Sequence, residues 1–338
     1  MQLHLGFVAI CLSERDCSPA GSMTVTAASR LDPEARRYRL REIARRNLEN
    51  TLRILFFARA HGIRLYRISA NMIPLATHPL TADWRWWDEP DLQATGARVG
   101  RVAREAGIRL SSHLPEVCGL GSASQFRWVQ AYLAYHRRLF DLLDLDEQAR
   151  IVIHVGGRRE RSRRQAGDGA PGKGGGAQQA KVLEVAGRHL GQLDGWARSR
   201  LVLENDDRTA DIATTLELAE RFRLPVAFDW HHHVCCPPSG FPDPVSPEGL
   251  TALEPLLARA FRLWRDRPPK IHLSSPRDGA SLRAHADYVD PAFVKPLLAI
   301  LPRLGVPEVD GMVEAKKKDL ALFRLARVLG AGTASPGP

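Results

Sequence analysis

The chain has little cysteine and no long apolar segment, and both scarcities narrow what it can be. Its 338 residues include five cysteines, an odd number without paired C-x-x-C spacing, so neither a disulfide framework nor a cysteine zinc site is predicted. It has no apolar run of the roughly 18 residues that a membrane-spanning helix needs. No basic segment precedes the apolar residues at the N-terminus, so we expect no secretory signal and a cytoplasmic location.

Acidic residues are fewer than basic ones. Lys and Arg number 48 against 38 Asp and Glu, which gives a net charge of +10, and such an excess is compatible with an anionic partner such as nucleic acid. Residues 158–181 alone contribute +5 of that charge. Charge therefore permits nucleic-acid binding without demonstrating it. The surrounding segment, 157–178, is rich in Gly and Arg without hydrophobic periodicity and is expected to be a flexible surface insertion.

Apolar strand-like segments alternate with amphipathic helical patterns along the chain. The expected strands are 3–10, 63–68, 108–113, 151–154, 201–206, 226–229, 270–273 and 309–314. The expected helices are 32–60, 91–106, 125–143, 180–196, 212–222, 247–264, 291–301 and 316–329. This alternation is typical of an α/β protein of the (β/α)₈ TIM-barrel class. We expect one catalytic domain over 1–329 and a disordered tail over 330–338. A doubly wound sheet is the alternative, but it would gather ligands at only one crevice.

Histidines and carboxylates recur at or just after the ends of expected strands three to eight. They are His113, His154, Glu204, Asp229, His232, His272, His285 and Glu314. In a closed barrel these strand ends converge on one mouth, and carboxylate and neutral imidazole together suit Zn, Mn or Fe. Because a catalytic zinc needs only about three protein ligands, the set predicts two or three ions. We expect Glu204 to bridge two of them, as in sites that hydrolyse phosphodiesters.

Eight motifs resemble those of the UV damage endonuclease family. They are GFVA at 6–9, YRIS at 66–69, PLATHP at 74–79, LENDD at 203–207, FDWHH at 228–232, KIHLSSP at 270–276, HADYVD at 285–290 and VEAK at 313–316. The resemblance covers nearly the whole chain, apart from the insertion and both tails. It implies a fold similar to endonuclease IV, Mn²⁺ as cofactor with Zn²⁺ or Mg²⁺ as alternatives, and incision of damaged double-stranded DNA 5′ to UV photoproducts and related lesions.

The same resemblance assigns roles to individual residues. It places all eight residues above at the metals, so that His232 alone of the triplet His231-His232-His233 is a ligand and its neighbours are expected in packing or supporting hydrogen bonds. Lys270 matches a catalytic lysine near the metals that can be carboxylated. A surface or phosphate-contacting lysine is the alternative for this residue.

The segment that would read the lesion departs from the family pattern. The family usually shows a His-Pro-x-Gln-aromatic run after the third strand, whereas this chain continues from His113 with Leu114-Pro115-Glu116-Val117. Glu116 adds a charge that phosphates repel, and Val117 has no ring to stack on a base. Phe7 keeps an aromatic residue at the end of the first strand, and the resemblance implies that Phe7, Glu116 and Val117 lie at the DNA. The metal chemistry is thus expected intact and the lesion-reading contacts altered.

Other residues could also contact DNA, each with a simpler alternative. Asn71 and His78 follow the second expected strand and could bind phosphate or form hydrogen bonds within their loop. Trp84, Trp86 and Trp87 could stack on bases or pack against the protein. Lys316 opens a basic run, expected at the start of the last helix, that could follow a DNA strand or face solvent.

The sequence therefore favours a monomeric, metal-dependent DNA repair endonuclease that acts on damaged double-stranded DNA and does not bind a membrane. An abasic-site endonuclease, or a paralogue with changed lesion specificity, is one alternative. A sugar isomerase or epimerase on a similar divalent-metal barrel is another, although such enzymes use one or two ions and mostly carboxylate ligands. A non-catalytic damage-binding protein is the third, and the complete ligand set argues against it.

Overall fold

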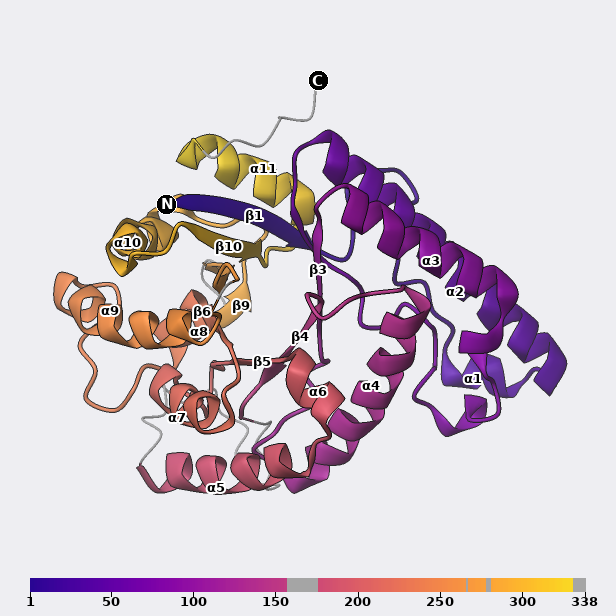
Figure 1. Cartoon of the computed structure of the whole chain (residues 1–338), viewed down its shortest axis with the longest axis horizontal. Coiled ribbons are helices and arrows are strands. Elements are labelled where there is room, and N and C mark those ends of the chain that lie inside the picture. The colour runs from indigo at the N-terminus through magenta and orange to yellow at the C-terminus, as the bar shows by residue number, and fades with distance from the viewer. Residues whose placement is uncertain (157–175, 266, 278–280, 331–338) are drawn as a thin grey trace. The chain divides into compact units, whose positions relative to one another are not determined.

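Eight parallel strands form a closed barrel in the order β1-β10-β7-β6-β5-β4-β3-β2, which confirms the TIM-barrel class. The computed structural model describes residues 1–156, 176–265, 267–277 and 281–330, and Figure 1 labels its elements. The barrel strands are β1 (Gln2–Val8), β2 (Leu65–Arg67), β3 (Arg109–His113), β4 (Arg150–His154), β5 (Leu201–Glu204), β6 (Val226–Asp229), β7 (Lys270–Leu273) and β10 (Glu308–Val313). Nearly all of the expected insertion and tail lies outside the described residues.

Helices follow the strands along the chain. They are α1 (Val25–Ser29), α2 (Pro33–Ala60), α3 (Pro90–Glu105), α4 (Ala123–Leu142), α5 (Gly176–Gln192), α6 (Gly195–Arg200), α7 (Ile212–Phe222), α8 (Trp230–Cys235), α9 (Pro247–Arg262), α10 (Pro291–Ile300) and α11 (Lys318–Leu329), with short 3₁₀ helices η1 (Pro79–Thr81), η2 (Trp86–Asp88) and η3 (Leu301–Leu304). Within the described part of the chain, no helix is both long and apolar enough to cross a membrane.

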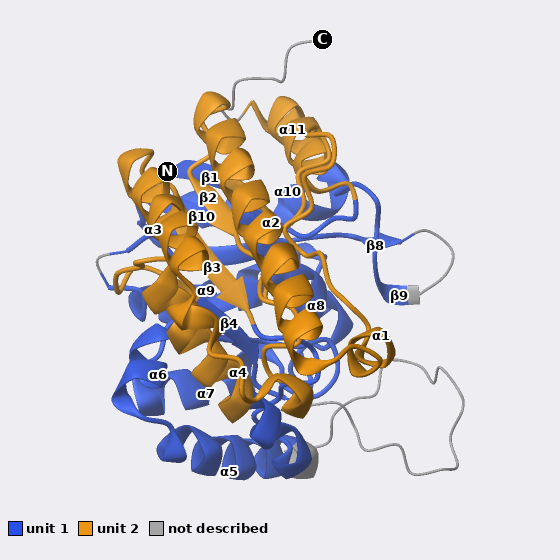
Figure 2. Cartoon of the chain, turned by 90° about the vertical axis from the view of Figure 1, so that its right-hand side faces the viewer, with its two compact units in different colours: residues 1–4, 114–129, 151–316 blue, residues 5–113, 130–150, 317–338 orange. Residues whose placement is uncertain are grey.

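The chain divides into two compact units, coloured separately in Figure 2. Unit 1 comprises Met1–His4, Leu114–Val129 and Ile151–Lys316, and unit 2 comprises Leu5–His113, Gln130–Arg150 and Lys317–Pro338. Unit 1 holds β5, β6, β7 and β10 and nearly all the expected metal ligands. Unit 2 holds β2, β3 and the long helix α2.

In unit 1 the strands are buried on both faces, as expected of a parallel sheet covered by helices. β5 and β6 are buried at every position, and Val152, Val202, Ala227 and Trp264 form one apolar cluster. The Trp264 indole N–H donates to the Val226 carbonyl oxygen at 2.7 Å, which satisfies the polar atom of this ring. Register pairs Asp229 with His272 across β6 and β7, so their side chains lie at one level of the barrel.

In unit 2, α2 and α3 run side by side (Figure 2). The Asp32 carboxylate caps α2 by accepting hydrogen bonds from two backbone N–H groups of its first turn, and Pro33 suits the first helical position. α3 approaches the end of α4 closely, because a Cβ built on Gly100 would lie 1.9 Å from the Leu143 carbonyl oxygen. Only glycine fits at that contact.

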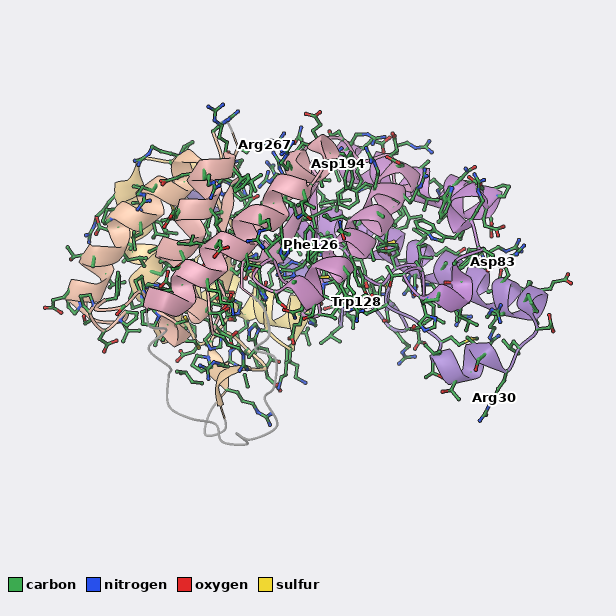
Figure 3. The ribbon with its side chains drawn as sticks, turned by 90° about the horizontal axis from the view of Figure 1, so that it is seen from below. Arg30, Asp83, Phe126, Trp128, Asp194 and Arg267 are labelled. Atoms are coloured by element: carbon green, nitrogen blue, oxygen red, sulfur yellow. The ribbon has the colours of Figure 1, made fainter. Side chains whose placement is uncertain are left out.

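Several local features differ from the expectations. The single helix expected over 180–196 is two helices, because Asp194, labelled in Figure 3, caps a new one by accepting from Ala197 N–H at 2.8 Å. Helix α8 and the antiparallel hairpin β8 (Pro276–Arg277) with β9 (Ser281–His285) were not expected. The last helix begins at Lys318, which has a φ of 48°, so Lys316 precedes the helix and the expectation that it lies within it was wrong.

Candidate metal centre

Four of the expected ligands converge at the carboxyl ends of the strands in unit 1. Glu204 ends β5 and Asp229 ends β6, while His272 lies on β7 and Glu314 follows β10. Each offers one ligand atom, and these atoms all lie within 4.8 Å of one another. Glu204, Asp229 and His272 have no exposed surface. The cluster is therefore a group of three carboxylates and one imidazole that is buried apart from the half-buried Glu314.

The three carboxylates surround one nitrogen atom. His272 Nδ1 lies 2.8 Å from Glu204 Oε1 and 3.2 Å from Glu314 Oε1. Its distance to Asp229 Oδ2 is 3.8 Å, and that buried oxygen has no hydrogen-bond partner among the residues that the structure describes. Three carboxylates gathered around imidazole nitrogens are a donor set typical of divalent metal sites, and the buried Asp229 Oδ2 is directed into this set. Divalent cations therefore fit these residues.

Asp229 is held in place by its own strand and by the neighbouring one. Its Oδ1 accepts the His232 backbone N–H at 2.7 Å and so caps α8, which leaves Oδ2 directed at the cluster. Its backbone N–H donates to Asn205 Oδ1, and its carbonyl oxygen accepts from Asn205 Nδ2, both at 2.9 Å. Asn205 was not singled out from the sequence, although it follows Glu204 in the LENDD motif. Its fully buried amide joins β5 to β6.

Two further histidines are oriented through Nδ1. His232 Nδ1 donates to the Asn205 carbonyl oxygen at 2.9 Å, and His285 Nδ1 donates to the Glu314 carbonyl oxygen at 2.8 Å. Metal-binding histidines are commonly oriented by such a bond, which leaves Nε2 as the ligand atom. His154 Nε2 lies 3.4 Å from Glu204 Oε2. Each of these three side chains can therefore contribute a nitrogen ligand next to the carboxylate cluster.

The carboxylates also change the protonation of these rings. Burial lowers the pKa of His232, but the Asp229 and Glu204 carboxylates raise it by more, to about 10. Burial likewise lowers the pKa of His154, and Glu204 raises it above its usual value. The site thus attracts positive charge, as protons or as metal ions, which compete for the same atoms.

The other two imidazoles of the triplet do not face the cluster, as expected. His231 Nδ1 lies 3.0 Å from Ser274 Oγ, and Nε2 lies 2.5 Å from the Leu282 carbonyl oxygen, so both nitrogens are engaged. His233 is buried, and its ring packs edge-on against Phe241 with a centroid distance of 5.0 Å. Helix α8 explains the difference, since residues three apart share a helix face and this places His232 near Asp229.

Lys270 and His113 complete the expected metal environment. Lys270 is the first residue of β7, two before His272, so both side chains point to the same face of the strand. It is 4% exposed, which rules out the surface alternative, and its register partner on β10 is the buried Asp310. His113 ends β3 in unit 2 and is half-buried.

A cavity of about 440 Å³ in unit 1 has three of the expected histidine ligands in its wall. It is lined by His154, His232 and His285, by the acidic Glu116, Asp206 and Asp207, by the basic Arg208, Arg283 and Lys316, and by Cys118 and Ala284. Glu116 and Val117 are both exposed, and Val117 does not line the cavity. Asp206, Asp207, Arg208 and Arg283 were not singled out as functional from the sequence. Their position depends on tertiary contacts between distant segments.

The remaining residues expected at DNA differ in exposure, and all but Lys316 lie in unit 2. Phe7 is fully buried against Tyr66, with ring centroids 5.4 Å apart, so its ring has no surface to offer to DNA in this structure. Asn71 is exposed. His78 Nδ1 accepts the Leu80 N–H at 3.0 Å and caps η1. This is the hydrogen bond within the loop that was the alternative to phosphate binding. Lys316 in unit 1 is exposed.

Two of the three tryptophans within 84–87 are buried in unit 2. Trp84 and Trp86 are 4% and 3% exposed, and Trp86 lies against Tyr135 of α4 with a centroid distance of 5.7 Å. Burial of these two rings agrees with the packing alternative rather than with stacking on bases.

Comparisons with known proteins agree with the resemblance. The family model described as UV-endonuclease UvdE matches residues 3–168 and 171–333. The UV DNA damage endonuclease of Bacillus pumilus (strain SAFR-032) is 34% identical over 335 residues, which cover 98% of this chain and 95% of the relative. The protein of the same name from Bacillus cereus (strain G9842) is 32% identical over 347 residues, covering 98% and 96%.

Solved structures are similar over almost the full length. The crystal structure of SacUVDE has a TM-score of 0.77 at 26% identity and covers 97% of this chain and 98% of that chain. Endonuclease IV from Thermus thermophilus has a TM-score of 0.55 at 17% identity, covering 98% of this chain and 100% of the other. At that identity the second likeness concerns the fold alone.

Proposed function

The chain belongs to the UV-endonuclease UvdE family and is an endonuclease of the UV damage type, and from this premise we propose that it hydrolyses the phosphodiester 5′ to UV photoproducts or related lesions in double-stranded DNA. We propose that two or three divalent ions, Mn²⁺ foremost, act at the eight expected ligands. The observation that carries the proposal is the convergence of Glu204, Asp229, His272 and Glu314 within 4.8 Å.

The expected ligands take different roles in this proposal, according to the chemistry of their side chains. Glu204 directs one oxygen to His272 and the other to His154, so it suits a bridging role between two cations. Asp229 and Glu314 supply further negative charge, and the Nδ1 bonds of His232 and His285 orient their rings. Divalent ions bound here would supply Lewis-acid activation of water and stabilise charge on the phosphate oxygens.

Lys270 takes a supporting role in this proposal. Because it is buried below His272 on the same strand face, it lies where a charged or carboxylated side chain acts on the metal environment rather than on a distant phosphate. We propose that it contributes to holding the ions, as the family resemblance implies.

A changed lesion specificity is the second candidate, and Glu116 is the observation that favours it. Its carboxylate lines the cavity beside the expected ligands, where it disfavours close approach of phosphate but can accept hydrogen bonds from exocyclic amino groups of bases. Val117 offers no ring to stack on an unpaired base. Abasic sites, which lack a base to be read, are the lesions that such a site would still accommodate. Because the chain belongs to an endonuclease family, the functions of a sugar isomerase and of a non-catalytic binding protein have less support.

Nicking of supercoiled plasmid tests the proposal. UV-irradiated plasmid should be converted to open circles with Mn²⁺ and not with EDTA, whereas untreated plasmid should remain closed. Glu204→Gln should reduce nicking to the EDTA background, because it removes a charge from the centre of the cluster. Glu220→Gln, which changes an exposed carboxylate on α7, is the matched control and should leave nicking unchanged. Cutting of abasic plasmid alone would favour the second candidate, and no metal-dependent nicking would refute both.

A further inference from the structure

Two arginines share one carboxylate on the wall of the cavity. Arg283 Nε donates to the Asp207 carbonyl oxygen at 3.0 Å and lies 3.2 Å from Asp207 Oδ2. Arg208 Nε lies 3.5 Å from the same Oδ2 atom. Because arginine is always charged in proteins, the Asp207 carboxylate holds two guanidinium cations on the wall of the cavity.

Two other arginines of unit 1 each pair with a carboxylate of their own. Arg259 makes two hydrogen bonds to the Glu220 carboxylate, at 2.9 and 2.8 Å, and Arg303 bonds Glu254 at 2.6 Å. Each of these pairs matches one arginine with one carboxylate, and none of the four residues lines the cavity. The shared carboxylate therefore distinguishes the cavity wall from ordinary surface ion pairs.

The loop that carries Asp207 and Arg208 is held rigidly. Asp206 accepts hydrogen bonds from four backbone N–H groups and from the Thr209 hydroxyl. One of these N–H groups belongs to Gly156, just after β4. The Asp206 carboxylate is thus engaged with the backbone and is 5% exposed, so it fixes the loop that carries Asp207 and Arg208.

The strand that carries Arg283 is anchored on both sides of this residue. The Leu282 carbonyl oxygen lies 2.5 Å from His231 Nε2, and His285 Nδ1 donates to the Glu314 carbonyl oxygen. Arg283 is therefore fixed on β9 between two contacts to the metal-centre region, and its guanidinium is oriented further by Asp207.

We propose that Asp207 holds Arg283 and Arg208 as a clamp that binds a phosphate of the nucleic-acid strand entering the cavity beside the metal centre. The guanidinium fork matches phosphate oxygens in a bidentate fashion, and orienting it beforehand lowers the entropic cost of binding. Lys316 lines the same cavity and adds a further cation. Arg283 and Arg208 are substrate-binding residues here, and Asp207 is a positioning residue. The inference rests on the proposed function, since it assumes that DNA enters this cavity.

Binding at different salt concentrations tests the clamp separately from catalysis. The full chain is titrated with a duplex containing one pyrimidine dimer, in EDTA, from low to physiological salt. Arg283→Gln should weaken binding roughly tenfold or more at low salt, as loss of a charged hydrogen bond does, and should reduce the slope of log affinity against log salt by about 0.9. Arg208→Gln, at a side chain that is 60% exposed, should lower the slope similarly without risk to folding.

Two more variants separate charge from orientation. Arg283→Lys should keep the wild-type slope but lose affinity, because a point charge replaces the oriented fork. Asp207→Asn keeps both arginines, so the slope should stay while affinity falls severalfold. Tighter binding by Asp207→Asn would show that this carboxylate competes with phosphate, and it would overturn the positioning role.

Arg259→Gln is the matched control, because it makes the same charge change and also breaks an arginine–carboxylate pair of unit 1. Its affinity and slope should equal those of the wild type. If Arg283→Gln and Arg208→Gln behave like this control while the wild type binds and nicks damaged DNA, the clamp is refuted and the proposed function stands. If the wild type neither nicks nor binds damaged DNA, the proposed function is refuted, and the clamp is refuted with it.

Discussion

Asn205→Ala is the substitution that tests most directly how the protein positions a metal ligand. The Asn205 amide makes two hydrogen bonds to the backbone of Asp229, both 2.9 Å long and fully buried. Truncation leaves the buried Asp229 N–H without its partner and removes one bond to the Asp229 carbonyl oxygen, which, as the N-cap carbonyl of α8, also accepts within the helix. The Asn205 carbonyl oxygen, which accepts from His232, is unaffected because it belongs to the backbone.

The magnitude follows from the group that is left unpaired. A buried polar group left without its partner costs about 1–3 kcal/mol, so the unpaired N–H predicts a loss of about 1–3 kcal/mol in the free energy of unfolding. Removing a group that orients a metal ligand weakens metal binding by about 10–100-fold. Asn205→Ala should therefore reduce both stability and Mn²⁺ affinity.

Urea unfolding in EDTA measures the first effect, and calorimetric titration of the metal-free protein with Mn²⁺ measures the second. Asn47→Ala is the control, since Asn47 is a buried asparagine of α2 whose amide also bonds backbone groups, those of Gly21 and Met72. It should destabilise the protein comparably and leave Mn²⁺ affinity unchanged. If Asn205→Ala unfolds more easily but binds Mn²⁺ like the wild type, Asn205 does not position Asp229 for the metal.

Two further predictions concern acid stability and the altered loop. The buried His136 accepts from Ser112 Oγ and donates to the Tyr132 carbonyl oxygen. Burial lowers the pKa of His136 from 6.5 to about 4, because folding favours the neutral ring. The free energy of unfolding should therefore fall by about 3 kcal/mol as the pH drops from above 6.5 towards 4. His136→Gln should flatten that part of the pH profile of urea unfolding, and an unchanged profile would contradict the assignment. Glu116→Gln should tighten binding of dimer-containing duplex in EDTA, because it removes a negative charge from the cavity; weaker binding would mean that the carboxylate contacts the DNA favourably.

The sequence predicted the parts of the fold that depend on local pattern. The bounds of β6, β7 and α7 agree residue for residue with expectation, because each is an apolar segment bounded by a proline or by a capping aspartate such as Asp211. The placement of Glu204, Asp229 and His272 followed from the barrel rule that strand ends converge. These inferences needed no knowledge of contacts between distant residues.

Other features depend on tertiary structure and could not be predicted in this way. Arg283 meets Asp207 across 76 residues of sequence, and neither belongs to a pattern that marks such a contact. The short helix α8 was missed because its six residues are too few to show a helical hydrophobic period, although His231 and His233 are buried, as expected. Phe7 was expected at DNA because of the family resemblance, but its side chain is fully buried.

We propose that this carboxylate–histidine centre cuts DNA on the 5′ side of a photoproduct. The most direct measurement is incision of a duplex that carries one pyrimidine dimer and a 5′ label, with Mn²⁺ or EDTA. We predict one labelled product ending just 5′ to the dimer, formed with Mn²⁺ by the wild type and by Glu220→Gln but not by Glu204→Gln. A product cut on the 3′ side, equal cutting by Glu204→Gln, or an intact duplex would contradict the account.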